Sequence, residues 1–186
     1  MHKDDKLKIN SKYENTRYRR YSLIDTTTFL VYGTKFMQSK QYNPTKNGGI
    51  IRKYKPLNVC DDLCFHKIVT YFVTHVKNIS GLECKKCMVH QIRVEVNNDS
   101  ITPVPEGIHQ DGYNYVGIMC VSRNNIQGGV NKIYTLNEEE IYNKVLEEGE
   151  MMIMNDRKVK HYVSNITRQD SSTKGYRDIL VMTSVF

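Results

Sequence analysis

The chain has 186 residues, enough for one domain with a buried core and a single small-molecule site, and too few for a large multidomain assembly. Hydrophobic residues make up 39% of it and charged residues 25%, a composition typical of globular proteins and not of disordered ones. No run approaches the roughly 20 apolar residues of a membrane span, and the N-terminus has no apolar signal segment. We therefore expect a cytoplasmic protein with no membrane anchor.

The net charge of +7 is concentrated near the N-terminus. Residues 1–60 contain 13 Lys and Arg against 4 Asp and Glu, whereas residues 61–186 contain 14 against 16. Residues 1–20 are polar and basic without a hydrophobic period, so we expect a basic N-terminal extension there and a single domain at 21–186. We favour the interpretation that this extension is a solvated segment. The alternative is that it binds nucleic acid.

The first expected elements are two short β runs and a helix. Residues 28–32 and 50–54 favour strands, and the Asn-Pro and Asn-Gly-Gly sequences between them are typical of turns. Residues 61–79 carry apolar side chains at helical spacing, with Asp61 or Asp62 as the N-terminal cap and Ser80-Gly81 as the stop. Because one face of this helix is apolar, we expect it to cover a sheet.

From residue 85 onward the pattern predicts β-structure. Strands are expected at 85–96, 115–123, 132–136, 150–154, 159–166 and 176–186, and a short helix capped by Asn137 is expected at 137–146. In the first of these strands Met88, His90 and Ile92 share one face, and Gln91 and Arg93 share the other. These elements predict an α+β fold: a double-stranded β-helix (jelly-roll, cupin-like) core at about 85–186 with an N-terminal covering helix.

The five cysteines offer one candidate site. Cys60-x3-Cys64 and Cys84-x2-Cys87 have the spacing of a four-thiolate zinc site. However, the first pair flanks the start of the apolar helix, and no zinc-knuckle glycines surround either pair. We favour reduced thiols that pack as small hydrophobic groups, with zinc binding as the alternative.

A second candidate site contains two histidines, an aspartate and an arginine. His109 and Asp111 lie two residues apart in an extended segment, so their side chains leave on the same side. His161 lies within a later strand, and Arg177 begins the apolar last strand, where a buried guanidinium needs an anion as its partner. Two imidazoles and one carboxylate form the facial triad of non-haem Fe(II) oxygenases.

Four segments carry a family resemblance: 103–112 (PVPEGIHQDG), 123–129 (RNNIQGG), 156–161 (DRKVKH) and 176–178 (YRD). In order and spacing they resemble the Fe(II)/2-oxoglutarate-dependent dioxygenases that include L-isoleucine 4-hydroxylase and related free-amino-acid hydroxylases. The resemblance implies that His109, Asp111 and His161 bind the iron and that Arg177 binds the distal carboxylate of 2-oxoglutarate. It also implies that 2-oxoglutarate and O2 are consumed while a small substrate, a free L-amino acid, is hydroxylated.

Further residues are candidates for contacts with 2-oxoglutarate or the substrate. Thr183 shares a strand face with Arg177 and is a candidate second contact for the same carboxylate. Glu106 is a candidate for a substrate ammonium group, with capping of its tight loop as the alternative. The remaining substrate candidates are Tyr113, Tyr115 and Arg123 at the pocket rim, and Gln91 and Arg93 on the strand face, for which an ordinary surface position is the alternative. We expect His66, His75 and His90 to be structural.

Two other functions remain open from the sequence. One is a dioxygenase that acts on a peptide side chain or a methylated nucleic acid, which only the basic N-terminus favours. The other is a catalytically inactive jelly-roll binding module. The oligomeric state is not indicated by any sequence pattern.

Overall fold

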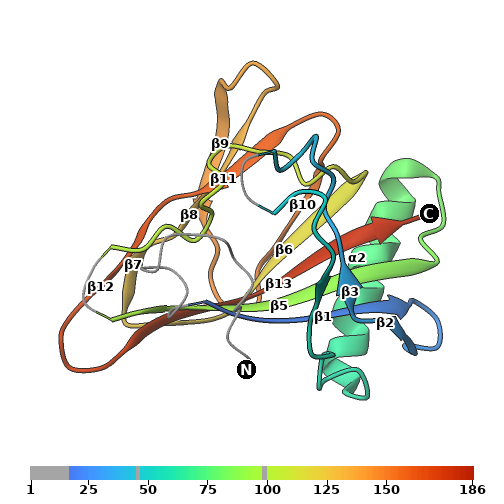
Figure 1. Cartoon of the computed structure of the whole chain (residues 1–186), viewed down its shortest axis with the longest axis horizontal. Helices are drawn as coiled ribbons and strands as arrows, with labels where there is room; N and C mark the ends of the chain where they lie inside the picture. The colour runs from blue at the N-terminus through green and yellow to red at the C-terminus, as the bar shows by residue number, and fades with distance from the viewer. Residues whose placement is uncertain (1–16, 45–46, 98–99) are drawn as a thin grey trace.

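The structure is a computed structural model that describes residues 17–44, 47–97 and 100–186. These residues form a mostly β protein with one α-helix (Figure 1), which is consistent with the expected jelly-roll fold. Residues 1–16, the larger part of the expected basic extension, lie outside the described residues.

The main sheet has six antiparallel strands. In spatial order they are β10 (Met151–Asn155), β6 (Tyr115–Asn124), β13 (Gly175–Val185), β5 (Lys86–Val96), β1 (Arg17–Asp25) and β2 (Val31–Gly33). A three-stranded sheet is formed by β11 (Lys160–Val163), β8 (Val130–Tyr134) and β9 (Glu140–Val145). Two short pairs complete the β-structure: β12 (Ile166–Arg168) with β7 (Ile126–Gly128), and β3 (Lys35–Phe36) with β4 (Arg52–Lys53).

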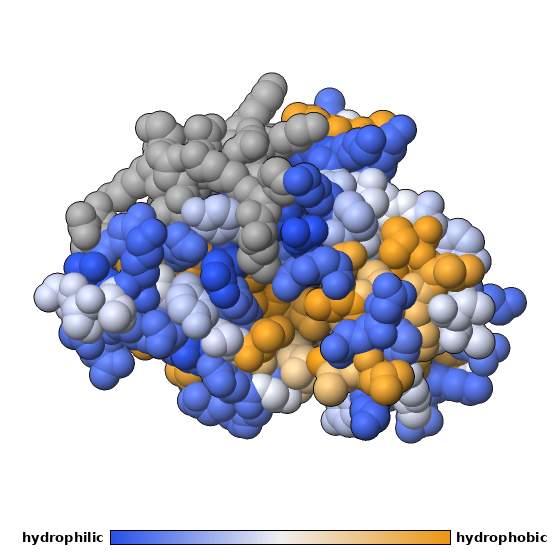
Figure 2. All heavy atoms as spheres, turned by 90° about the horizontal axis from the view of Figure 1, so that it is seen from below, coloured by the Kyte–Doolittle hydropathy of each residue, from blue (hydrophilic) through white to orange (hydrophobic). Residues whose placement is uncertain are grey.

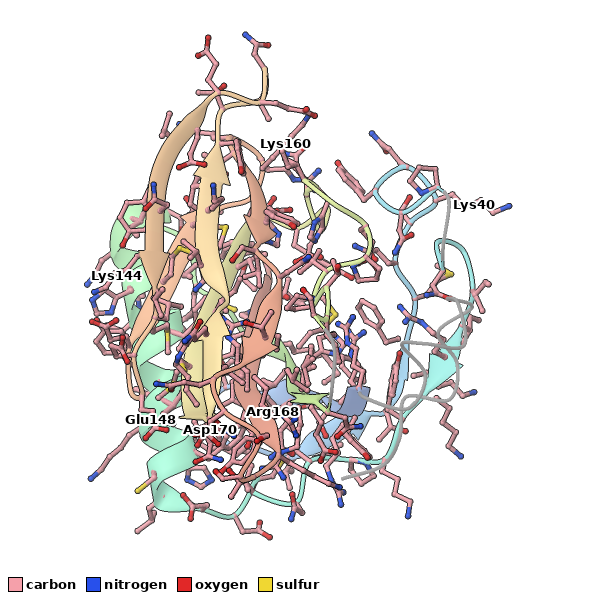
Figure 3. All side chains as sticks on the ribbon, turned by 90° about the vertical axis from the view of Figure 1, so that its left-hand side faces the viewer. Lys40, Lys144, Glu148, Lys160, Arg168 and Asp170 are labelled. Atoms are coloured by element: carbon pink, nitrogen blue, oxygen red, sulfur yellow. The ribbon has the colours of Figure 1, made fainter. Side chains whose placement is uncertain are left out.

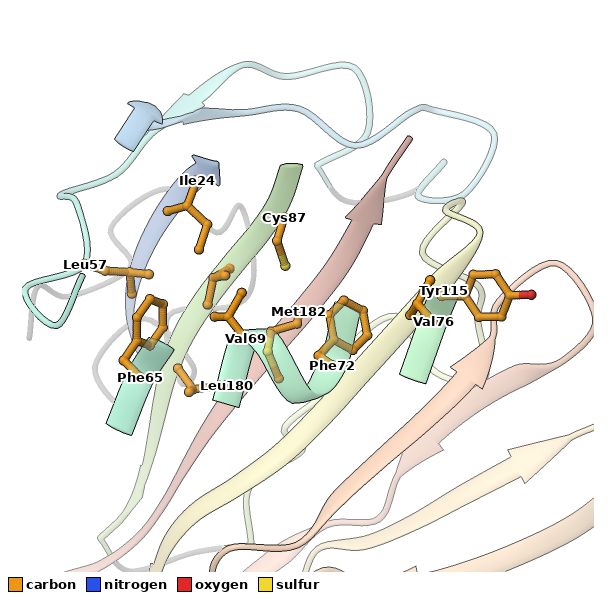
Figure 4. Packing of buried hydrophobic residues seen from close by; sticks show 11 residues of the cluster. Ile24, Leu57, Phe65, Val69, Phe72, Val76, Cys87, Tyr115, Leu180 and Met182 are labelled. Atoms are coloured by element: carbon orange, nitrogen blue, oxygen red, sulfur yellow. The ribbon is translucent and has the colours of Figure 1, made fainter. Parts of the chain in front are cut away.

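The helix α2 (Leu63–Ser80) lies close to the expected range and packs on one face of the main sheet (Figure 4). The Asp62 side chain accepts hydrogen bonds from the backbone N–H groups of Cys64 and Phe65, and Gly81 ends the helix in the left-handed conformation. The buried face packs against β5 and β13 through Phe65, Val69, Phe72 and Val76 of the helix and Cys87, Val89, Leu180 and Met182 of the strands. No helix in the described ranges is long and apolar enough to cross a membrane.

The alternation of β5 separates the two faces of the main sheet. Val89 faces the helix, whereas His90, Ile92 and Val94 face a pocket on the opposite side. Strand β13 pairs with β5 so that Val181 lies opposite His90 and Ile179 opposite Ile92. The pocket side of the sheet is therefore built from neighbouring residues of β5 and β13.

Residues 17–20 differ from the sequence expectation, because they belong to the domain and not to an extension. Arg17–Asp25 pairs with β5 along its whole length, from Arg17 opposite Val94 to Asp25 opposite Lys86. The inward-facing positions of this strand include arginines, so its period of two is not visible in the hydrophobic pattern.

The predicted helix at 137–146 is wrong. Residues 140–145 form β9, which pairs with β8, and the two strands are joined by a tight turn in which Glu138 has a φ of 67°. The residues that favoured a helix cap and an acidic first turn instead form this turn. The expected strand at 159–166 is divided into β11 and the start of β12.

On the face seen in Figure 2, apolar side chains gather on the half of the molecule that carries α2 and β2. The exposed apolar residues at the ends of these elements include Leu30 and Leu63. Figure 3 shows the three-stranded sheet with Lys144 and Lys160 at its margins; these lysines form ion pairs with Glu150 and Glu138.

Candidate active site

A two-residue backbone bridge brings the two candidate histidines together. The N–H of His109 donates to the carbonyl of His161 at 3.1 Å, and the N–H of His161 donates to the carbonyl of His109 at 2.8 Å. Residues that exchange both bonds in an antiparallel pair have their side chains next to each other, and the two ring centroids are 4.3 Å apart. Thus a loop residue and a strand residue 52 positions apart lie side by side.

Asp111 completes the cluster. Its Oδ1 lies 3.7 Å from Nε2 of His109, and its Oδ2 lies 3.5 Å from Nε2 of His161. One donor atom from each residue lies within 4.8 Å of the others, and no second such group is found in the part of the chain that the structure describes. Nε2 of His161 is buried without a hydrogen-bond partner, so its position fits that of a metal ligand. Two imidazole nitrogens and a carboxylate oxygen are donors that suit Fe(II).

Neighbouring groups orient these donors. Nδ1 of His109 lies 2.9 Å from the carbonyl oxygen of Gly107, which favours a proton on Nδ1 and a free electron pair on Nε2. The Gln38 amide donates to Oδ1 of Asp111 at 3.2 Å. Gly112 follows Asp111 with a φ of 91°, and a Cβ atom there would lie 2.2 Å from the ring of Tyr42. A glycine is therefore required directly after the carboxylate.

A buried carboxylate, that of Asp156, fixes the loop that carries Asp111. It accepts hydrogen bonds from the backbone N–H groups of Asp111 at 3.1 Å, Gly112 at 2.7 Å and Tyr113 at 3.1 Å. The Asp156 side chain is 0% exposed. Burial raises the pKa of Asp156, and the charge of Asp111 acts in the same direction. Asp156 is not among the site residues expected from the sequence, because its role is visible only from these three contacts.

Replacing Asp156 with alanine should weaken iron binding by about 10- to 100-fold, the usual effect of losing an outer partner of a metal ligand. The backbone of residues 111–113 would lose all three hydrogen bonds to this side chain, so the carboxylate of Asp111 would no longer be held beside the histidines. Titration of the apoprotein with Fe(II) under anaerobic conditions measures this change. Asp156→Asn keeps one acceptor oxygen and should restore part of the affinity; equal iron affinity in both variants and the parent protein would contradict the assignment.

The charges of the cluster are mutually stabilising. Burial favours the neutral form of Asp111, but hydrogen bonding and charge from His109 and His161 outweigh it and hold the pKa of Asp111 well below its usual value. Burial also acts to lower the pKa of His109, but Asp111 outweighs this effect and raises that pKa to about 9. Asp111 therefore carries its charge at neutral pH, as a metal-binding carboxylate must.

The cluster opens into a pocket that also contains a buried arginine. Arg177 is 2% exposed, and its Nη2 donates to Oδ1 of Asn131 at 3.1 Å. Its Nε is buried without a partner, and no carboxylate of the described residues forms an ion pair with it. Burial lowers the pKa of Arg177 to about 10. A buried guanidinium of this kind is stabilised by an anion that binds in the pocket.

Among the other predicted residues, Glu106, Tyr113 and Thr183 line the pocket, whereas Gln91, Arg93, Tyr115 and Arg123 do not. Thr183 lies on the same strand face as Arg177, as expected. However, six residues of strand separate the two, about 20 Å, so one carboxylate cannot contact both.

Three of the four residues outside the pocket have structural contacts, whereas the Oε1 of Gln91 is buried without a hydrogen-bond partner. Gln91 and Arg93 point away from the pocket because the other face of β5, with His90 and Ile92, forms its wall. Arg93 pairs with Asp178 at 2.6 Å. Tyr115 packs in the core beneath α2, and Arg123 donates to the carbonyl of Gly128 at 2.9 Å.

The pocket also contains residues that the sequence analysis missed. His90, expected to be structural, lies on the pocket wall, although burial and the charge of Arg19 hold its pKa well below the usual value. The missed residues with polar side chains are Arg17, Arg19, Gln38, Arg52 and His90. The available signal was the spacing of Arg17, Arg19 and Tyr21, which alternate along one strand.

The four cysteines of the candidate zinc site do not come together as a metal site. Cys84 and Cys87 are buried, whereas Cys64 is exposed at the start of α2. The His109, Asp111 and His161 cluster is the one metal-type grouping within the described ranges. The interpretation of the cysteines as small packing groups agrees with the place of Cys87 in the core beneath α2.

Comparison with known proteins gives a family and a fold. The family model described as 2OG-Fe dioxygenase matches residues 1–183. A bsmA homolog from Methylobium petroleophilum PM1 has a TM-score of 0.81 at 20% identity, over 98% of this chain and 75% of that one. IDO from Bacillus thuringiensis has a TM-score of 0.72 at 22% identity, over 94% of this chain and 82% of that one. The Fe(II)/(alpha)ketoglutarate-dependent dioxygenase TqaL has a TM-score of 0.61 at 14% identity, over 96% and 70%. No curated protein matches the chain by sequence.

Proposed function

The chain belongs to the 2OG-Fe dioxygenase family, and from this premise we propose that it hydroxylates a small substrate, a free L-amino acid. The family uses Fe(II), 2-oxoglutarate and O2, and a His-Asp-His cluster suited to iron is present. Membership in this family identifies an enzyme, so the alternative of an inactive binding module is set aside. The narrower relation to L-isoleucine 4-hydroxylase is part of the proposal and rests on the sequence resemblance.

We assign the iron to His109, Asp111 and His161, and the distal carboxylate of 2-oxoglutarate to Arg177. The observation that carries the proposal is that one pocket contains both the triad and a buried guanidinium without an acidic partner. When bound, iron and 2-oxoglutarate supply the oxidising chemistry, in which decarboxylation to succinate and CO2 accompanies hydroxylation. The chain's own residues fix the position of each reactant.

The rest of the pocket lining is suited to holding an aliphatic part of the substrate, with its C–H bond, close to the iron. Apolar side chains form much of the wall and keep water from the substrate: Ile92, Val94, Ile118, Val163, Ile179 and Val181. Glu106 lies at the same pocket, and we assign to it the ammonium group of the substrate. We place these groups in one jelly-roll domain at 21–186, extended by residues 17–20 of β1.

Succinate release tests the proposal. The protein is supplied with Fe(II), 2-oxoglutarate and O2, with and without single L-amino acids, and succinate is measured. We expect one amino acid to raise succinate release, and we expect mass spectrometry to show that this amino acid has gained one oxygen atom. Succinate release that rises only with peptides or methylated nucleic acid would contradict the free-amino-acid assignment and support the macromolecular alternative.

A further inference from the structure

Two arginines of β1, Arg17 and Arg19, line the same pocket as the triad. They are two residues apart and leave the same face of the main sheet, with Arg17 opposite Val94 of β5. Arg177 is also opposite Val94, from the other side of β5. Because neighbouring strands are about 4.8 Å apart, Arg17 begins about 10 Å from Arg177 across the sheet. The two β1 arginines therefore enter the pocket from a different strand than the arginine assigned to 2-oxoglutarate.

Three contacts hold the Arg19 side chain in this position. Its Nε donates to Nδ1 of His90 at 3.0 Å. Its guanidinium carbon lies 5.3 Å from the centroid of the Phe36 ring and 5.2 Å from that of the Tyr54 ring, distances typical of cation–π contacts. These contacts use one nitrogen and the flat faces of the group, and they leave its two terminal nitrogens available for a ligand.

Arg17 adds a second guanidinium with unused donors. Its Nη1 donates to the carbonyl of Pro103 at 3.2 Å, while its Nε is buried without a partner. Within the described ranges neither Arg17 nor Arg19 forms an ion pair with a carboxylate. Arg19 is buried and Arg17 is half-buried. Guanidinium groups withdrawn from water without an anion are unfavourable, so the pair is suited to a ligand that brings negative charge.

The arginine pair lies within reach of the iron site. Phe36, which packs on Arg19, is two residues from Gln38, whose amide donates to Asp111; in an extended chain this separation is about 7 Å. The Asn43 amide contacts both Oε1 of Gln38 at 3.0 Å and Oε1 of Glu106 at 3.4 Å. One small molecule can therefore contact the arginine pair and Glu106 while it lies beside the triad.

We propose, building on the function above, that the substrate is an acidic amino acid of the L-aspartate or L-glutamate class. Its two carboxylates pair with Arg17 and Arg19, and its ammonium group pairs with Glu106. A neutral aliphatic amino acid has one carboxylate and would leave one of these guanidinium groups without an anion.

Binding and turnover of matched substrates test this inference. Affinities of L-aspartate, L-glutamate, L-leucine and L-isoleucine are measured by calorimetry on the protein loaded with Fe(II) and 2-oxoglutarate under anaerobic conditions, and succinate release is measured in air. We expect L-aspartate or L-glutamate to bind at least about tenfold more tightly than either neutral amino acid, because hydrogen bonds between charged partners are stronger than those between neutral ones.

Variants separate the inference from a general charge effect. Arg19→Met should lower the affinity for the acidic substrate by at least about tenfold. Its affinity for 2-oxoglutarate should be unchanged. Arg17→Met is the second variant, because Arg19 also packs against Phe36 and Tyr54 and its loss can affect folding. Arg20→Met is the matched control: Arg20 is adjacent on β1, does not line the pocket and donates to the carbonyl of Pro56.

Two results would overturn the inference in distinguishable ways. A neutral amino acid that is preferred, with an affinity unchanged by Arg19→Met and Arg17→Met, would refute the acidic class while the proposed hydroxylation stands. If no amino acid of either kind binds or raises succinate release, the proposed function fails, and the substrate inference fails with it.

Discussion

Replacing Asp111 with alanine is expected to abolish iron-dependent turnover and to lower iron affinity by more than 100-fold, beyond the roughly 10- to 100-fold loss caused by removing an outer partner. Asp111 is the one carboxylate of the triad and lies between the two imidazoles, 3.7 Å from His109 Nε2 and 3.5 Å from His161 Nε2. Without it, two neutral imidazoles remain to hold a doubly charged cation.

The measurement is an anaerobic Fe(II) titration together with succinate release, on protein whose fold is checked by circular dichroism and thermal unfolding. Asp170→Ala provides a matched control, because Asp170 is an exposed loop carboxylate (Figure 3) bonded to Ser172. The control should keep both iron affinity and turnover. Iron-dependent succinate release by a folded Asp111→Ala variant would contradict the assignment of Asp111 as an iron ligand.

The sequence predicted those parts of the fold that have a regular hydrophobic period. Helix α2 has apolar residues at helical spacing and a recognisable cap at each end, so its bounds were predicted to within two residues. Strands β5 and β13 have apolar residues on both faces and were also placed correctly. The hairpin at 134–140 was not recognised, because Asn137 and the acidic residues after it are equally suited to a helix start and to an exposed turn.

The candidate site was only partly predictable, because sequence spacing does not give the order of strands in a sheet. His109 and Asp111 are close along the chain, and the family resemblance joined them to His161. Arg17 and Arg19 become part of the pocket because β1 lies beside β5. That pairing is invisible in the sequence, where a basic run near the N-terminus resembles a solvated segment.

Gln91 and Arg93 illustrate the same limit on a single strand. The alternation of β5 was predicted correctly, but either face could have been the pocket wall. In the structure His90 and Ile92 line the pocket, because Val89 on the opposite face packs beneath α2. A polar side chain on a strand is therefore weak evidence for a binding role until the position of the covering helix is known.

Replacing Arg177 with leucine is expected to raise the KM for 2-oxoglutarate by roughly 10- to 100-fold, which corresponds to losing a charge-assisted hydrogen-bonding partner. The guanidinium is buried, with one side-chain partner, Asn131, and an Nε without any. Its burial lowers the pKa of Arg177 to about 10, so the charge is unfavourably placed until an anion pairs with it. A carboxylate from 2-oxoglutarate provides that anion.

The stability of the ligand-free protein is not expected to fall when Arg177 is replaced. Removing a buried charge that lacks an ionic partner relieves its desolvation, so Arg177→Leu should unfold at the same or a higher temperature than the parent protein when no ligand is added. The parent should gain stability on addition of 2-oxoglutarate, by about 2.7 kcal/mol at a concentration 100 times Kd. In the variant this gain should largely disappear.

Arg93→Leu is the matched control for both measurements. Arg93 lies on the same sheet, faces away from the pocket and pairs with Asp178, the residue next to Arg177. Its loss should leave the KM for 2-oxoglutarate unchanged. If Arg177→Leu behaves as this control does, and 2-oxoglutarate still raises its unfolding temperature, then the distal carboxylate binds elsewhere. The guanidinium groups of Arg17, Arg19 and Arg52, which line the same pocket, would then be the candidates to receive it, and the acidic-substrate inference would be tested at the same time.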